Sequence, residues 1–171
     1  ISLPWDQMDK EYLTEPKKWK ASSIGKFMAY FGPTSSIFDI TTYLLMYFVI
    51  CPAVVGGNFH SLDAKQQVIF IALFHAGWFV ESLWTQTLVL HALRTPKIPF
   101  LQSNATFAMF IITTLGIVVG SILPFTGFGA ELGLLPLPGT YWIWLIVTVL
   151  AYLALVTMVK KIYIKKFGEL L

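Results

Sequence analysis

The chain has 171 residues, of which 56% are hydrophobic and 12% are charged, whereas a soluble domain carries about 25% charged residues. This composition excludes an ordinary water-soluble domain and indicates a membrane protein. The net charge is +3, but the lysines flank long apolar runs, so we expect them to orient the chain in a bilayer rather than to bind nucleic acid. The single cysteine, Cys51, excludes an internal disulfide and a zinc site made of several cysteines.

The N-terminal segment at 1–36 is polar, aromatic and mixed in charge, and it lacks the apolar core of a signal peptide. We interpret it as a cytoplasmic connector followed by a short interfacial helix at about 24–31. Gly32-Pro33 is expected to end this helix, because a proline disfavours helical backbone in the residue before it. Since the chain starts at Ile1, we expect it to be part of a longer polypeptide, although trimming of a small intact protein gives the same start.

Four apolar runs follow the N-terminal segment. Each has roughly 19 to 26 residues, which as a helix is long enough to span a hydrocarbon core of about 30 Å. Lipid offers no hydrogen bonds to the backbone, and the runs lack the alternation of β-barrel strands, so we expect helices. The predicted fold is an all-α membrane protein, a four-transmembrane-helix bundle with a short N-terminal interfacial helix. The runs lie at 37–55, 68–93, 105–125 and 141–159.

Two features mark the ends of the predicted spans. Pro52 and the glycines that follow it mark the far end of the first span. Tyr141, Trp142 and Trp144 stand at the start of the fourth run, where an aromatic belt anchors a helix at the interface. The two outer links, at about 56–67 and 126–140, are rich in glycine and poor in charge, so they are predicted to be loops.

Basic residues are distributed unevenly around the four runs. Eleven of the 12 Lys and Arg residues lie in the N-terminal segment, in the link after the second run, or in the tail. With four spans, these three segments share one side, and only Lys65 lies on the other. Because basic residues favour the cytoplasmic side, both termini are predicted to be cytoplasmic. The chain therefore divides into a connector with an interfacial helix at 1–36, a transmembrane domain at 37–159 and a tail at 160–171.

The second run carries polar residues that cannot all face lipid. A charged group inside a bilayer marks a functional site by default, so Glu81, Gln86 and His75 are candidates to line an ion or proton pathway. The alternative is that these groups only form interhelical hydrogen bonds in the bundle. Helical spacing puts them on two neighbouring stripes, which are Gly77, Glu81 and Thr85, and His75, Ser82 and Gln86.

Outside the second run, candidate residues are few. Asp39, near the cytoplasmic end of the first run, can ligate a cation, but capping a helix or bonding nearby hydroxyls is the favoured interpretation. Gly116 and Gly120 form a small-xxx-small motif, for which packing within the bundle is favoured over dimerisation, while a homo-oligomer stays open. The sequence has no phosphate-binding loop, nucleophile motif or paired-histidine motif, so no catalytic residue is predicted.

Four stretches of the sequence match a known family, namely ISLPWDQMDKEYLTEPKKWK at 1–20, GPTSSIFDITTYLLMYFV at 32–49, GWFVESLWTQTLVLHALRTPKIPFLQS at 77–103 and YIKKFGELL at 163–171. They resemble the C-terminal membrane region of bacterial magnesium-transporting P-type ATPases. The first stretch resembles the connector after that family's sixth transmembrane helix, and the last resembles its C-terminal end. The second resembles the start of the seventh helix, and the third resembles the eighth helix with the following loop.

The resemblance implies a pump of the bacterial inner membrane that uses ATP to import Mg²⁺. The phosphorylated aspartate of the family's DKTG motif, the ATP-binding domain and the main ion ligands would lie in other parts of the full-length protein. This chain would correspond to the seventh to tenth helices, with the other transmembrane helices, the cytoplasmic domains and membrane lipid as its partners. It would be inactive alone and bind no cofactor. Related pumps place an acidic ion ligand on the eighth helix, where Glu81 is the candidate metal ligand.

Two other functions remain open at this stage. A self-contained four-helix channel or carrier would need polar stripes on several helices, or oligomerisation through Gly116 and Gly120. A membrane scaffold without transport activity would bury Glu81 with its hydrogen bonds satisfied. Within the pump class, transport of calcium or of a monovalent cation is a further alternative, because the choice of ion depends on helices outside this chain.

Overall fold

We describe a computed structural model of the chain, covering residues 21–95, 97–98 and 102–168. Its regular elements are all helices, and four segments are long and apolar enough to cross a membrane. The predicted all-α fold with four spans is therefore confirmed. The elements are α1 (Ala21–Leu45), η2 (Met46–Ile50), α2 (Cys51–Val55), η3 (Phe59–Ser61), α3 (Ala64–Leu93), α4 (Phe107–Ile122), η4 (Leu123–Phe125), α5 (Gly127–Glu131) and α6 (Gly139–Phe167).

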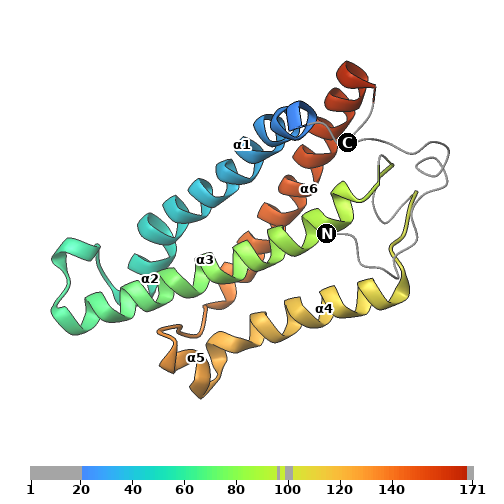
Figure 1. Cartoon of the computed structure of the whole chain (residues 1–171). Helices are drawn as coiled ribbons and strands as arrows, with labels where there is room; N and C mark the ends of the chain where they lie inside the picture. The colour runs from blue at the N-terminus through green and yellow to red at the C-terminus, as the bar shows by residue number, and fades with distance from the viewer. Residues whose placement is uncertain (1–20, 96, 99–101, 169–171) are drawn as a thin grey trace.

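The helix α3 is the centre of the arrangement. It packs against α1, α4 and α6. The helix α1 also packs against α6, whereas α4 makes its extensive contacts with the spanning helices through α3. Figure 1 shows the same order, with α3 running between α1 and α4. The apolar core at the α2 end of the bundle gathers around Met46, Phe70 and Tyr141. A second core, around Phe31, Tyr152 and Tyr163, joins α1 to α6.

The first span is a single long helix that continues through Pro33. The predicted helix at 24–31 is helical, but the prediction that Gly32-Pro33 ends it is wrong. A proline removes one backbone donor, and in membrane helices side-chain hydroxyls can satisfy carbonyl groups near such a site. Here the Thr34 hydroxyl donates to the carbonyl oxygen of Tyr30 at 3.1 Å, and that of Ser36 to Gly32 at 3.4 Å.

The far end of the first span contains a second proline, Pro52. A π-helical turn, η2, lies directly before it, and the backbone N–H of Cys51 donates to Met46, five residues back. Such turns commonly mark places where a helix adjusts to an interruption of its hydrogen bonds. Gly56 then ends the helix with a left-handed backbone at φ 91°. The helix therefore ends after Pro52, at the residue where the sequence predicts the first apolar run to end.

The second span starts earlier than its apolar run indicates. The helix α3 begins at Ala64 because Asp63 and Gln66 form a capping box. The Gln66 backbone N–H donates to the Asp63 carboxylate at 2.8 Å, and the Asp63 N–H donates to the Gln66 side chain at 3.2 Å. The capping box can be recognised in the sequence, and it indicates a helix start at Ala64, four residues before the predicted start at 68.

The fourth span, α6, extends well beyond its apolar run and ends at Phe167. Its buried residues recur at spacings of three and four, so that one stripe faces the bundle along the whole helix. The stripe consists of Tyr141, Leu145, Val149, Tyr152, Val156, Lys160 and Tyr163. The predicted boundaries at 36/37 and 159/160 thus fall inside continuous helices, and they remain predictions about where the membrane begins and ends.

Lys160 is the unexpected member of this stripe, because it is only 1% exposed. Its ammonium group donates to three backbone carbonyl oxygens, that of Ala92 at the end of α3 at 2.8 Å, and those of Thr95 at 3.0 Å and Lys97 at 2.6 Å in the link that follows. The last carbonyls of a helix lack intrahelical partners and carry the negative end of its dipole. Lys160 therefore joins α6 to the end of α3 with all three of its donors used.

The two glycines of the third span have different surroundings. Gly120 is buried against Leu83 of α3, and a Cβ atom there would overlap the Leu83 side chain. Gly116 is exposed and has open space where its Cβ would lie. Beside Gly120, the Trp84 indole donates to the Ser121 hydroxyl at 2.9 Å. Of these two glycines, only Gly120 lies at a close approach between α4 and α3.

We expect Lys160→Met to lower the free energy of unfolding by about 3 kcal/mol, because it leaves three carbonyls without a charged donor. Thermal unfolding in detergent micelles measures this loss. The matched control is Lys161→Met, which changes the exposed neighbouring lysine and should alter stability little. Equal losses in the two variants would show that the ammonium contacts of Lys160 do not stabilise the fold.

We expect Gly120→Val to lower the stability by about 1–3 kcal/mol, because the branched side chain overpacks the contact with Leu83. Gly116→Val places the same side chain in open space and should leave the melting temperature nearly unchanged. A loss in Gly116→Val as large as that in Gly120→Val would contradict the α3–α4 packing.

Candidate ion-pathway site at the junction of α1, α3 and α6

Glu81 lies in the middle of α3 and is 1% exposed. Neither of its carboxylate oxygens has a hydrogen-bond partner among the described residues. Burying a carboxyl group without a partner is costly, and native structures tolerate it mainly where the group has a further role. The alternative in which Glu81 is held by interhelical hydrogen bonds therefore has no support from the described residues.

The hydroxyl groups around Glu81 bind backbone rather than its carboxylate. The Tyr141 hydroxyl of α6 donates to the Gly77 carbonyl oxygen at 2.6 Å, one turn before Glu81. The Thr85 hydroxyl donates to the backbone oxygen of Glu81 at 3.1 Å. Met46 packs against Gly77, where a Cβ atom would meet its sulfur. The stripe predicted from Gly77, Glu81 and Thr85 is thus buried together, facing α1 and α6.

Asp39 brings a second carboxyl group to this junction. It lies half-buried on α1, close to the Trp78 side chain of α3. It is also within electrostatic range of Glu81. A hard cation such as Mg²⁺ prefers oxygen ligands, and carboxylates are the strongest that a protein supplies. Among the described residues no three His, Cys, Asp or Glu side chains gather, so any ion held here needs further ligands of another kind.

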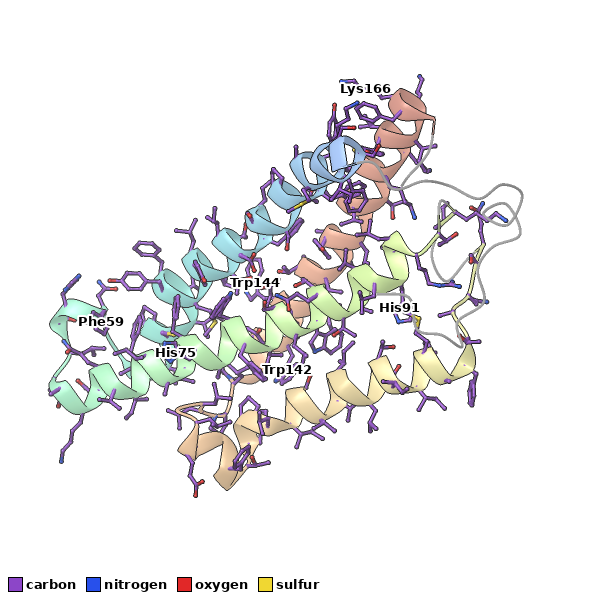
Figure 2. All side chains as sticks on the ribbon, viewed as in Figure 1. Phe59, His75, His91, Trp142, Trp144 and Lys166 are labelled. Carbon is purple, nitrogen blue, oxygen red and sulfur yellow. The ribbon has the colours of Figure 1, made fainter. Side chains whose placement is uncertain are left out.

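His75 and Gln86 lie on a different face of α3. Both are exposed in this chain, and Figure 2 labels His75 on the first half of α3. The Gln86 side chain donates to the Ser82 hydroxyl at 3.0 Å. Asp39 is therefore within electrostatic range of Glu81, whereas His75 and Gln86 lie exposed on another face of α3.

Residues of α6 at this junction were not predicted as part of the site. Tyr141 was expected in an aromatic belt, but it is 1% exposed and its hydroxyl reaches α3, so that prediction is wrong for Tyr141. Tyr152 is also buried, beside Ser35 and Phe38 of α1. Their spacing of eleven residues puts both tyrosines on one face of a helix, which is the signal that indicates a shared buried stripe.

Four apolar helices with a buried carboxyl group at their junction define an integral membrane domain of the kind found in ion-transport proteins. The chain belongs to the family described as "Cation transporting ATPase, C-terminus", whose profile matches residues 1–162. This match includes the whole of α1, α3 and α4, and α6 as far as Ile162.

Three relatives support the same family, and each carries the name "Magnesium-transporting ATPase, P-type 1". Two are from Salmonella typhimurium (strain LT2), with 48% identity over 99% of this chain and 39% identity over 98% of it. The third, from Escherichia coli (strain K12), is 38% identical over 98% of this chain. The chain spans 17% of the length of these relatives.

We expect Glu81→Met to raise the free energy of unfolding by about 1 kcal/mol or more, because it removes a buried carboxyl group that has no partner. Thermal unfolding of the detergent-solubilised protein measures the change, with Glu131→Met in the exposed α5 as the control. A clear loss of stability in Glu81→Met, without one in Glu131→Met, would show that Glu81 has a structural partner.

Proposed function

We propose that this chain is the C-terminal membrane domain of an ATP-driven magnesium transporter, and that Glu81 contributes to its ion path. The family match and the names of the three relatives support the class of pump and the ion. The observation that carries the role of Glu81 is its burial at a helix junction with no partner for either carboxylate oxygen.

The physical basis of this role is electrostatic. A carboxylate in a region of low dielectric attracts a divalent cation far more strongly than it would in water. Glu81 and Asp39 would add negative charge and oxygen atoms to a path whose remaining ligands come from other helices of the pump. ATP binding and phosphoryl transfer would take place in parts of the full-length protein outside these 171 residues. The contacts of α3 with α1 and α6 would make this domain a support that braces the transport helices of the pump.

The proposed location is the bacterial inner membrane, with several spans and both termini in the cytoplasm. Four apolar helices support a multi-pass protein, and the bacterial relatives support the inner membrane. The orientation rests on the excess of lysine and arginine in the N-terminal segment, in the link after α3 and in the tail.

The alternatives are less well supported than a pump. Membership in a cation-ATPase family does not favour a self-contained channel or a scaffold without transport activity. The relatives named as magnesium-transporting favour Mg²⁺ over calcium or a monovalent cation.

The test is Glu81→Gln in the full-length pump, which removes the negative charge and keeps the shape of the side chain. We expect the Mg²⁺ concentration for half-maximal ATPase stimulation to rise roughly tenfold, as for the loss of a group that supports a metal. ATP hydrolysis by purified pump in liposomes measures it.

Glu131→Gln is the matched control, because Glu131 is an exposed carboxylate at the end of α5. It should leave the Mg²⁺ dependence unchanged. Normal Mg²⁺ dependence in Glu81→Gln would remove Glu81 from the ion path, and a full-length protein whose ATPase ignores Mg²⁺ would contradict the proposed ion.

A further inference from the structure

Tyr141 of α6 is bonded to the helical turn of α3 that carries Glu81. Its hydroxyl donates to the Gly77 carbonyl oxygen at 2.6 Å. In an α-helix this oxygen also accepts the backbone N–H four residues later, which here belongs to Glu81. A carbonyl oxygen has two lone pairs, so it can accept from both donors. The Tyr141 hydroxyl therefore shares its acceptor with the backbone of Glu81, and the two groups lie close together.

The α1 side of the same turn is held by Met46, the first residue of the π-helical turn η2. Met46 is 0% exposed and packs directly against Gly77. A Cβ atom at Gly77 would overlap the Met46 side chain, so this close approach requires a glycine. The turn that carries Glu81 is thus in contact with η2 through packing and with α6 through a hydrogen bond. Of these two contacts, the hydrogen bond is the directional one.

Packing fixes the ring of Tyr141, so its hydroxyl has a defined place. The residue is 1% exposed and belongs to the apolar core around Met46 and Phe70. The neighbouring Trp142 ring meets it edge-on, with 5.8 Å between the ring centroids. A group that orients a functional side chain has to be held within about 0.5 Å, and packing of this kind achieves it.

The carboxylate of Glu81 depends on this turn for its position. Neither of its oxygens has a hydrogen-bond partner among the described residues, so its place there is set by packing and by the backbone from which it extends. A small rotation of the turn from Gly77 to Glu81 would therefore move the carboxylate with it. The ordinary explanation for Tyr141, that a buried hydroxyl simply finds a partner, predicts no effect on an ion that Glu81 attracts.

We propose that Tyr141 is a positioning residue for Glu81, because its bond to Gly77 fixes the turn from which the carboxylate extends toward the ion path. This inference rests on the proposed function. In Tyr141→Phe the ring and its packing remain, and only the directional contact with α3 is lost. The pump then binds Mg²⁺ less tightly, since groups that orient a metal-supporting side chain affect metal affinity even when they do not touch the ion.

The test compares Tyr141→Phe, Glu81→Gln and the double variant in the full-length pump. We expect Tyr141→Phe alone to raise the Mg²⁺ concentration for half-maximal ATPase stimulation roughly three- to fivefold, with the maximal rate unchanged. This is less than the shift expected for Glu81→Gln, because the carboxylate is still present but is less well placed. If Tyr141 acts through Glu81, the double variant behaves like Glu81→Gln alone. ATP hydrolysis by purified pump in liposomes measures all three.

Tyr163→Phe is the matched control. Tyr163 belongs to the same buried stripe of α6 and is 3% exposed, but its ring packs against Phe27, Tyr30 and Phe31 near the other end of the helix. It should leave the Mg²⁺ dependence unchanged. A shift in Tyr163→Phe as large as that in Tyr141→Phe would overturn the proposal, because it would be a general effect of losing a hydroxyl from α6.

The failure of this inference and that of the proposed function give different results. An unchanged Mg²⁺ dependence in Tyr141→Phe, beside a clear shift in Glu81→Gln, would overturn the positioning role and leave the proposed function intact. An equal further shift when Tyr141→Phe is added to Glu81→Gln would also overturn it, because the hydroxyl would then act independently of Glu81. A normal Mg²⁺ dependence in Glu81→Gln would instead refute the ion path through Glu81 together with the role of Tyr141.

Discussion

A bilayer core contains no water to satisfy polar groups, and this constraint organises the whole bundle around α3. The helix carries polar side chains on several sides, and each side has a different neighbour. Toward α4, Trp84 bonds Ser121, and His91 shares a hydrogen bond of 2.9 Å with Thr113. Figure 2 shows His91 near the end of α3, next to α4.

Toward α6 the same constraint is met mainly through the backbone of α3. The Tyr141 hydroxyl binds the Gly77 carbonyl in the first half of the helix, and the Lys160 ammonium binds the Ala92 carbonyl at its end. Glu81 lies between these two contacts and has no partner of its own among the described residues. The contrast with its satisfied neighbours is what separates Glu81 from an ordinary packing residue.

The main architecture could be predicted from the sequence, because apolar length alone decides where a chain can cross lipid. The four spans followed from this argument, and it also singled out Glu81 as a candidate residue. The continuous helix through Pro33 could not be predicted, since proline rules developed for soluble helices apply less strictly in a membrane. The neighbours of Glu81 also depend on how helices rotate against one another, so the sequence could not show that His75 and Gln86 are exposed on another face of α3. Lys160 was assigned to the tail by its charge, although the buried spacing of Tyr152 and Val156 continues to it.

The ammonium of Lys160 also fixes the position of α6 along α3. Sliding α6 along α3 by one helical turn, about 5.4 Å, would withdraw the charge from its carbonyls and leave it buried without partners. Such a displacement is costly, so we expect α3 and α6 to move together as one rigid body. Any rearrangement during a transport cycle would then take place at the boundary between this pair and the rest of the protein, and not inside it.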